Sequence, residues 1–199
     1  MKTERRAMSM NRRTSILRLA AVFAMVALML TPAALAAPKP GKPALITSAG
    51  QSTDGLILKT ILTDKATGEA VPFEKLAEPR DLEGIRTLIV SVGLSSKGLG
   101  AAGINVDQEK ARVRSLLDVA KKDGIFVMMV HIGGTARRGK GSDEFATLVA
   151  DYAHHILVVK TGNDDGFFTR LAQAKKIPLT EVDDRIAIGA PIKDLLNTK

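Results

Sequence analysis

Four segments rich in glycine, serine and basic residues hold most of the side chains in this sequence that could do chemistry. They are residues 48–54, 93–103, 133–141 and 161–166. Glycine lets the backbone approach a ligand closely, while serine and asparagine supply hydrogen bonds. Lysine and arginine supply charge and directional donors. Together these groups favour the binding of a small anion, such as a carboxylate, a phosphate or an anionic metabolite.

The segment 93–103 is the most distinctive of the four. It contains two serines, one lysine and several glycines, and it follows an apolar run at 88–92. A connection between a strand and a helix usually takes roughly 2–6 residues, so this segment is longer than the turn itself requires. We therefore expect a flexible loop that cradles an anion.

The candidate ligand-binding residues are the polar, basic and glycine residues of these segments. They are Ser48, Gln51, Ser52, Gly93, Ser95, Ser96, Lys97, Gly98, Gly100, Gly133, Gly134, Arg137, Arg138 and Asn163. We expect Lys97 and Arg137 to neutralise the anion, together with backbone N–H groups. The same residue types also form ordinary turns and solvated surface. These segments are therefore either plain connections or a ligand-binding site.

Two catalytic patterns fall in the same segments. Ser95 or Ser96 beside Lys97 or His131 would suit a hydrolase or transferase with a serine nucleophile. Residues 98–103 match the dinucleotide fingerprint GxGxxG, but five residues separate its first glycine from the preceding strand, and the expected acid is missing. The sequence has no GxSxG, HExxH or P-loop motif, so the catalytic residues stay unknown and we expect no cofactor.

Metal binding has little support in the sequence. There is no cysteine, which excludes thiolate catalysis and cysteine-based metal sites. His154 and His155 stand at the start of an expected strand and lack carboxylate partners. Asp164 and Asp165 suit the start of a helix. We expect His131 to be a hydrogen-bonded structural histidine, and we expect no metal site.

Strand, loop and helix patterns alternate along the chain. Apolar runs predict five strands, at 43–47, 86–92, 125–132, 156–160 and 177–182. The pattern also predicts a helix over 106–122, a helix capped by Ser52 or Thr53, and another capped by Ser142.

This alternation predicts one three-layer α/β domain over residues 43–199. We expect a mostly parallel, doubly wound sheet of about five strands, of the Rossmann or flavodoxin type. Ligands bind such sheets beyond the carboxyl ends of the strands, where the winding direction reverses. That rule would bring the four segments together at one edge of the sheet.

Residues 1–36 have the three parts of a secretory signal peptide. A basic start precedes the apolar run 19–30, and small residues close the segment at Ala36. We expect cleavage after Ala36, an extended lead-in at 37–42, and export to the periplasm or the medium. No later segment approaches the roughly 18 apolar residues of a membrane span.

Loss of this segment would change the charge of the protein. It holds six of the basic residues and one acidic residue, so the formal net charge falls from +8 to +3. The chain has no tryptophan, and Tyr152 is its single tyrosine. Nucleic-acid binding is therefore poorly supported. Both Met1 and Met10 are candidate starts, and the pair at 12–13 leaves twin-arginine export open beside the general secretory route.

Four motifs in combination resemble a family of exported bacterial proteins classed as a domain of unknown function. The motifs are ITSAGQS at 46–52, SSKGLGAAGI at 95–104, HIGGTARRG at 131–139 and KTGNDDGFFT at 160–169. The resemblance spans residues 43–196. It implies export and a single domain, and it carries no catalytic residues.

These observations favour an extracytoplasmic protein that binds a small anion without catalysis. Its expected partner is a membrane transporter or sensor. The alternatives are the serine-based hydrolase or transferase, and a protein-interaction module whose loops dock another protein.

Overall fold

Five parallel strands form the centre of the protein. The computed structural model describes residues 37–198, and the expected signal peptide at 1–36 lies outside the described residues. The strands are hydrogen-bonded in the order β1-β2-β3-β4-β5. They are β1 (Ala44–Ala49), β2 (Thr87–Val92), β3 (Phe126–His131), β4 (His155–Val159) and β5 (Leu179–Val182).

The register of the strands aligns their carboxyl ends. Ala49 of β1 lies opposite Val92 of β2, and His131 of β3 lies opposite Val158 of β4. Every residue of β1, β2 and β3 is buried, as expected for parallel strands that are covered on both faces. The loops after the strands therefore begin at one common edge, which we call the carboxyl edge.

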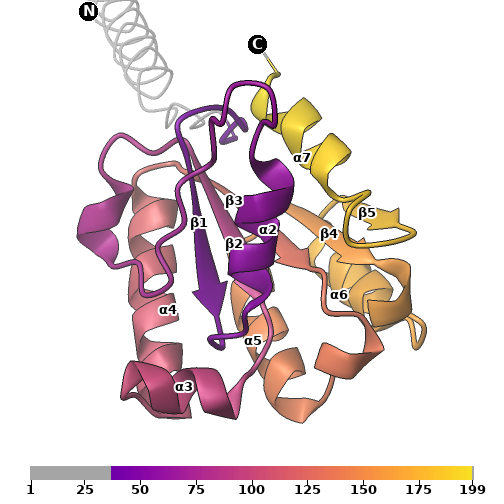
Figure 1. Cartoon of the computed structure of the whole chain (residues 1–199). Coiled ribbons are helices and arrows are strands. Elements are labelled where there is room, and N and C mark those ends of the chain that lie inside the picture. Colours follow the sequence, from indigo (N-terminus) through magenta and orange to yellow (C-terminus); the bar gives the residue numbers. More distant parts are fainter. Residues whose placement is uncertain (1–36, 199) are drawn as a thin grey trace, which may run out of the picture. The chain divides into compact units, whose positions relative to one another are not determined.

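Helices cover both faces of the sheet (Figure 1). The described residues form α2 (Asp54–Leu62), α3 (Ser96–Ala102), α4 (Val106–Lys122), α5 (Lys140–Ala150), α6 (Phe167–Lys175) and α7 (Gly189–Leu196). Leu117 of α4, Phe145 of α5 and Phe168 of α6 lie in the core on one face. Leu58 of α2 and Ile192 of α7 lie in the core on the other. The α/β class, the three layers and the five-stranded parallel sheet are thus confirmed.

The strand order is consecutive, so the chain does not reverse its direction across the sheet. The doubly wound order that we expected needs such a reversal, and this sheet has no switch point. Helices still reach both faces, because the chain after α2 passes the outer edge of β1, where Phe73 pairs with Ile46. It then forms the 3-10 helix Pro79–Leu82, whose Leu82 belongs to the core on the α4 face.

The segment 93–103 is not the flexible loop that we expected, because most of it folds into α3. The Ser95 hydroxyl caps this helix by accepting a hydrogen bond from the Gly98 N–H group at 3.0 Å. Gly103 ends it with a φ of 68°, which favours glycine. A Cβ atom on Gly98 would collide with the Gln51 carbonyl oxygen. Gly98 therefore allows α3 to pack closely against Gln51, and Gly103 allows the helix to end.

Two of the expected helix N-caps also differ from the prediction. Helix α5 begins at Lys140, and the Ser142 hydroxyl inside it accepts a hydrogen bond from the Leu94 N–H group at 3.0 Å. Thr53 is the N-cap of α2, although its side chain makes no capping hydrogen bond. The helix expected over 106–122 has the predicted bounds. Across residues 37–198, no helix has the length and apolar character needed to cross a membrane.

Candidate functional site

Charged side chains converge on a pocket at the carboxyl edge, beside the start of α2. This pocket, which we call the edge pocket, has a volume of about 450 Å³. The loops after β3, β4 and β5 contribute to its wall together with α2. Its charged and hydroxyl lining residues include Asp54, Arg137, Thr161, Asp183, Asp184 and Arg185. Loops that are far apart in sequence meet here because parallel strands end at the same edge.

Asp54 is the buried charged residue of the edge pocket. Only 4% of the residue is exposed, and its Oδ2 atom has no hydrogen-bond partner. A carboxylate oxygen in this position has lost its water and has gained no donor in exchange, which is unfavourable. A hydrogen-bond donor on a ligand would remove that cost.

Two glycines of the predicted set make room for the Asp54 carboxylate. A Cβ atom on Gly133 would lie 2.9 Å from Asp54 Oδ2, and one on Gly93 would lie 3.3 Å from it. The same Cβ on Gly133 would collide with the Arg137 side chain. Asp54 and Arg137 therefore both flank the bare backbone of Gly133, yet they form no ion pair with each other among the described contacts.

Arg137 and Arg185 supply positive charge to the pocket from two different loops. Within residues 37–198, no hydrogen bond or ion pair engages either guanidinium group. Asp183 and Asp184, which also line the pocket, do have partners within the protein. Asp183 is paired with Lys160, whose pKa it raises. Two backbone N–H groups bind the Asp184 carboxylate and hold its pKa below the ordinary value.

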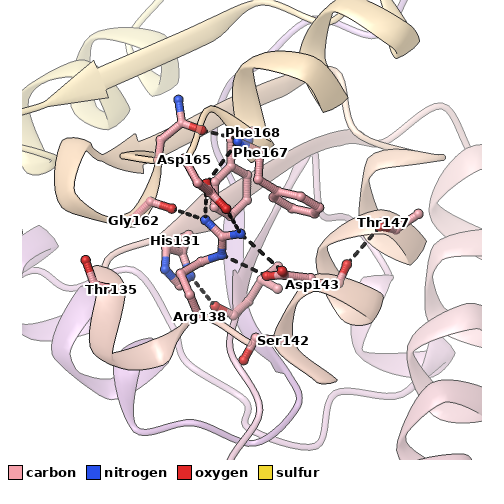
Figure 2. A network of polar contacts seen from close by, with 12 residues as sticks. His131, Thr135, Arg138, Ser142, Asp143, Thr147, Gly162, Asp165, Phe167 and Phe168 are labelled. Carbon is pink, nitrogen blue, oxygen red and sulfur yellow. Dashed lines mark hydrogen bonds and ion pairs between the residues drawn. The ribbon is translucent and has the colours of Figure 1, made fainter. Parts of the chain in front are cut away.

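Arg138, the neighbour of Arg137, is held by hydrogen bonds and ion pairs within the protein (Figure 2). It donates to Asp143 at 2.7 and 3.1 Å, to Asp165 at 3.0 and 3.1 Å, and to the Gly162 carbonyl oxygen. Its guanidinium carbon also lies 4.6 Å from the centre of the Phe167 ring. These contacts use all five N–H donors of the side chain, so none remains for a ligand.

This ion-pair network shifts the pKa values of its members. The hydrogen bonds from Arg138 lower the pKa of Asp165 to about 2. The hydrogen bond to Asp143 is the main cause that raises the pKa of Arg138 itself. The charged forms of both groups are thus favoured, and the network ties the loop after β3 to the loop after β4.

Asn163 is also engaged by the protein. Its Nδ2 atom donates to the Thr169 hydroxyl at 2.7 Å and to Glu181 Oε1 at 2.8 Å. Its Oδ1 atom accepts a hydrogen bond from the Phe168 N–H group at 2.7 Å. Asn163 was predicted to contact a ligand, but its side chain instead binds a backbone N–H group at the start of α6.

His131 is a buried structural histidine, as expected. Its Nδ1 atom lies 3.0 Å from the Val92 carbonyl oxygen, and its Nε2 atom lies 3.3 Å from the Gly134 carbonyl oxygen. A neutral imidazole carries one N–H group, so it donates to one of these carbonyls at a time. The ring also packs against Phe168, with 5.2 Å between the ring centroids.

The geometry does not assemble the serine-based catalytic pairs. Ser95 is occupied as the cap of α3. Ser96 and Lys97 are exposed on the same helix, outside the edge-pocket lining. No hydrogen bond of the described chain joins either serine to Lys97 or to His131. Gly100 lies on the same helix with open space around it.

The predicted residues Ser48, in β1, and Gln51 and Ser52, in the loop after it, are buried. The Gln51 Nε2 atom donates to Glu109 Oε1 at 2.9 Å, and the Ser48 hydroxyl donates to the Ser52 carbonyl oxygen at 3.4 Å. Glu109 is fully buried and also binds Arg112 at 2.8 Å. This network holds the loop that leads directly into Asp54.

The structure therefore keeps three of the predicted residues in the edge pocket: Gly133, Gly134 and Arg137. Asp54 and Arg185 also line the pocket, but neither was among the predicted residues. Asp54 ends the polar segment 48–54 and begins α2. Arg185 could have been found by applying the carboxyl-edge rule to the loop after the last strand as well.

The described residues also form an apolar cavity away from the carboxyl edge. This second cavity of about 410 Å³ lies at the amino end of β1 and is lined mainly by apolar side chains, including Leu62, Val71 and Leu196. It contains none of the described buried side-chain atoms that lack a partner. No group of three or more metal-ligating side chains occurs among the residues that the structure describes.

Comparison with known proteins identifies the family to which the sequence is similar. A family model described as a domain of unknown function (DUF6305) matches residues 41–196. This match confirms that the sequence resembles a family classed as a domain of unknown function. No curated protein matches the sequence.

Among solved structures, the chain is similar to a candidate acylhydrolase from Bacteroides fragilis NCTC 9343. The two chains are 12% identical, the match covers 80% of this chain and 88% of that chain, and the TM-score is 0.33. A likeness of this degree assigns no activity to the chain.

Proposed function

The chain belongs to the family described as a domain of unknown function (DUF6305), and we propose that it binds a small anionic molecule in the edge pocket. The pair Arg137 and Arg185 carries this proposal. Both line the pocket, they come from separate loops, and no described hydrogen bond or ion pair engages either guanidinium group. Arginine presents a rigid fork of donors that fits a carboxylate or a phosphate with two hydrogen bonds.

The rest of the pocket supports binding of a small molecule. Ile57, Ile132 and Val159 give the lining an apolar part, and the volume of about 450 Å³ lies in the usual range of ligand sites. The Arg138 and Glu109 networks hold the surrounding loops in place. Such preorganisation favours affinity because less conformational entropy is lost on binding.

A thermal-shift assay of the purified protein with carboxylates and phosphates tests this proposal. A ligand at 100 times its dissociation constant should stabilise the protein by about 2.7 kcal/mol. The double substitution Arg137→Ala with Arg185→Ala should abolish the shift. Lys97→Ala is the matched control, because this exposed lysine lies outside the pocket lining.

Two results would contradict the proposal. One is that no anion raises the melting temperature. The other is that the double arginine variant responds like the natural protein. Loss of the response in the Lys97→Ala variant would instead favour a site at α3.

We also propose that the protein acts outside the cytoplasm and serves a membrane transporter or sensor. The support is the pattern of residues 1–36, with its basic start, apolar run and small residues up to Ala36. Mass spectrometry of the protein recovered after expression should find a chain that begins at Ala37. Recovery of a chain that still carries residues 1–36 would contradict export by cleavage at this position.

A further inference from the structure

We propose that the ligand of the edge pocket is a zwitterion of the amino-acid type. Its carboxylate would bind Arg137 and Arg185, and its ammonium group would bind Asp54. This inference rests on the proposed anion-binding function and names the class of ligand for the same pocket.

The burial of Asp54 calls for a cationic donor. Its Oδ2 atom is buried and unpartnered, and the residue is only 4% exposed. A hydroxyl group would satisfy one hydrogen bond, but an ammonium group would also compensate the buried charge. A ligand with negative charge alone would place that charge close to the buried Asp54 carboxylate, which is unfavourable.

The position of Arg137 supports a ligand with two opposite charges close together. The Asp54 carboxylate and the Cβ and Cγ atoms of Arg137 both flank Gly133, so an acidic and a basic residue of the pocket lining are neighbours. They form no ion pair with each other among the described contacts, and Asp54 Oδ2 has no hydrogen-bond partner, so both lining residues keep bonding capacity for a ligand group. An α-amino acid carries its ammonium and carboxylate groups on one carbon atom, and this arrangement fits such a pair.

The remaining lining suits the side chain of an amino acid. Ile57, Ile132, Ala136 and Val159 present aliphatic groups in the same pocket. Burying an apolar ligand side chain against them would add to the affinity. We therefore expect amino acids with apolar side chains to bind more tightly than charged ones.

Isothermal titration of the purified protein with matched ligand pairs tests the inference. The pairs are alanine and propionate, leucine and 4-methylpentanoate, phenylalanine and 3-phenylpropanoate, and glutamate and glutarate. Within the pair that binds, the amino acid should bind at least about tenfold more tightly than its deaminated analogue, because the analogue leaves the Asp54 carboxylate unpaired.

Substitution of Asp54 in the protein tests the proposed contact between the ligand ammonium group and the Asp54 carboxylate. Asp54→Asn should weaken binding of the amino acid at least about tenfold, and it should leave the affinity of the deaminated acid unchanged or higher. Asp164→Asn is the control, because Asp164 is exposed and lies outside the pocket lining. If Asp54→Asn does not fold, the ligand pairs decide the question on the natural protein.

The outcomes separate this inference from the proposed function. Equal binding of amino acids and their deaminated analogues would overturn the zwitterion and leave the anion site standing. Binding of phosphates or dicarboxylates, with no amino acid bound up to about 10 mM, would do the same. Failure of every anion to bind would overturn both proposals.

Discussion

Asp54 Oδ2 lies 2.9 Å from the position that a Cβ atom on Gly133 would take. The carboxylate and the backbone of the loop after β3 are thus in such close contact that glycine is required. The side chain of Arg137 occupies the other side of the same position. Gly133 therefore leaves room for both the Asp54 carboxylate and the stem of the Arg137 side chain.

We expect Gly133→Ala to disturb both charged groups at once. The added methyl group must displace Asp54 and Arg137, and such overpacking should lower the free energy of unfolding by about 1–3 kcal/mol. The thermal shift caused by a ligand should also be lost. Urea unfolding and the thermal-shift assay measure the two effects.

Gly100→Ala provides the control for this substitution. Gly100 lies in α3 with nothing within 4 Å of an added Cβ atom. Alanine there should stabilise the helix by about 0.5–1 kcal/mol and leave ligand binding unchanged. If Gly133→Ala behaved like Gly100→Ala, the proposed arrangement of the pocket would be wrong.

Arg137 and Arg138 should respond differently to substitution by alanine. Arg138→Ala removes a largely buried side chain from the more exposed Asp143 and Asp165, and we expect a loss of about 1–3 kcal/mol in stability. Arg137→Ala breaks no described ion pair, so we expect a change within about 0.5 kcal/mol. Ligand binding should nevertheless weaken in the Arg137 variant. Equal stabilities of the two variants in urea unfolding would contradict this assignment of roles.

The low pKa of Asp165 predicts sensitivity to strong acid. Arg138 holds this pKa at about 2, whereas an unfolded chain has a value of about 3.9. The stabilisation is therefore complete above about pH 4 and is lost as the pH falls toward 2. Asp165→Asn should flatten the loss of stability in this interval. A carboxyl titration by NMR should find a higher pKa for Asp165 in the Arg138→Ala variant.

His154 predicts a second dependence on pH. Burial lowers its pKa, and its Nδ1 atom accepts a hydrogen bond from the Val127 N–H group at 3.0 Å. The folded protein thus favours the neutral ring. The stabilisation is present above the unfolded pKa of about 6.5 and is lost as the pH falls below it. His155 shifts in the same direction for the same reason.

Urea unfolding at pH 7.5 and at pH 5.5 measures this effect. The natural protein should be less stable at the lower pH, and His154→Gln should reduce the difference while His155 keeps its own share. An unchanged difference in the variant would show that His154 does not contribute.

Much of the fold could be predicted because the signals are local. The apolar run at 126–131 marks a strand that is buried on both faces. The spacing of Val113, Leu116 and Leu117 predicts the buried side of α4, which has the expected bounds. The order of the strands could not be predicted in this way. It depends on the face of the sheet over which each connecting segment passes.

The candidate site was predicted only in part. The carboxyl-edge rule pointed to the end of the sheet where the edge pocket lies, and to its lining residues Gly133, Gly134 and Arg137. It also pointed to the segment 93–103, where the Ser95 cap and the contact of Gly98 with Gln51 produce a helix instead of a loop. Those contacts join residues that are far apart in sequence.

The sequence by itself therefore determined the α/β class, the five strands, the family and the edge at which a pocket lies. Only the tertiary structure distinguished Arg137 from Arg138 and revealed the buried Asp54. The physical reason is that adjacent arginines have the same chemistry until their neighbours are known. Asp143, Asp165 and the Gly162 carbonyl oxygen use every donor of Arg138, while Arg137 and Asp54 flank Gly133 without side-chain partners among the described residues.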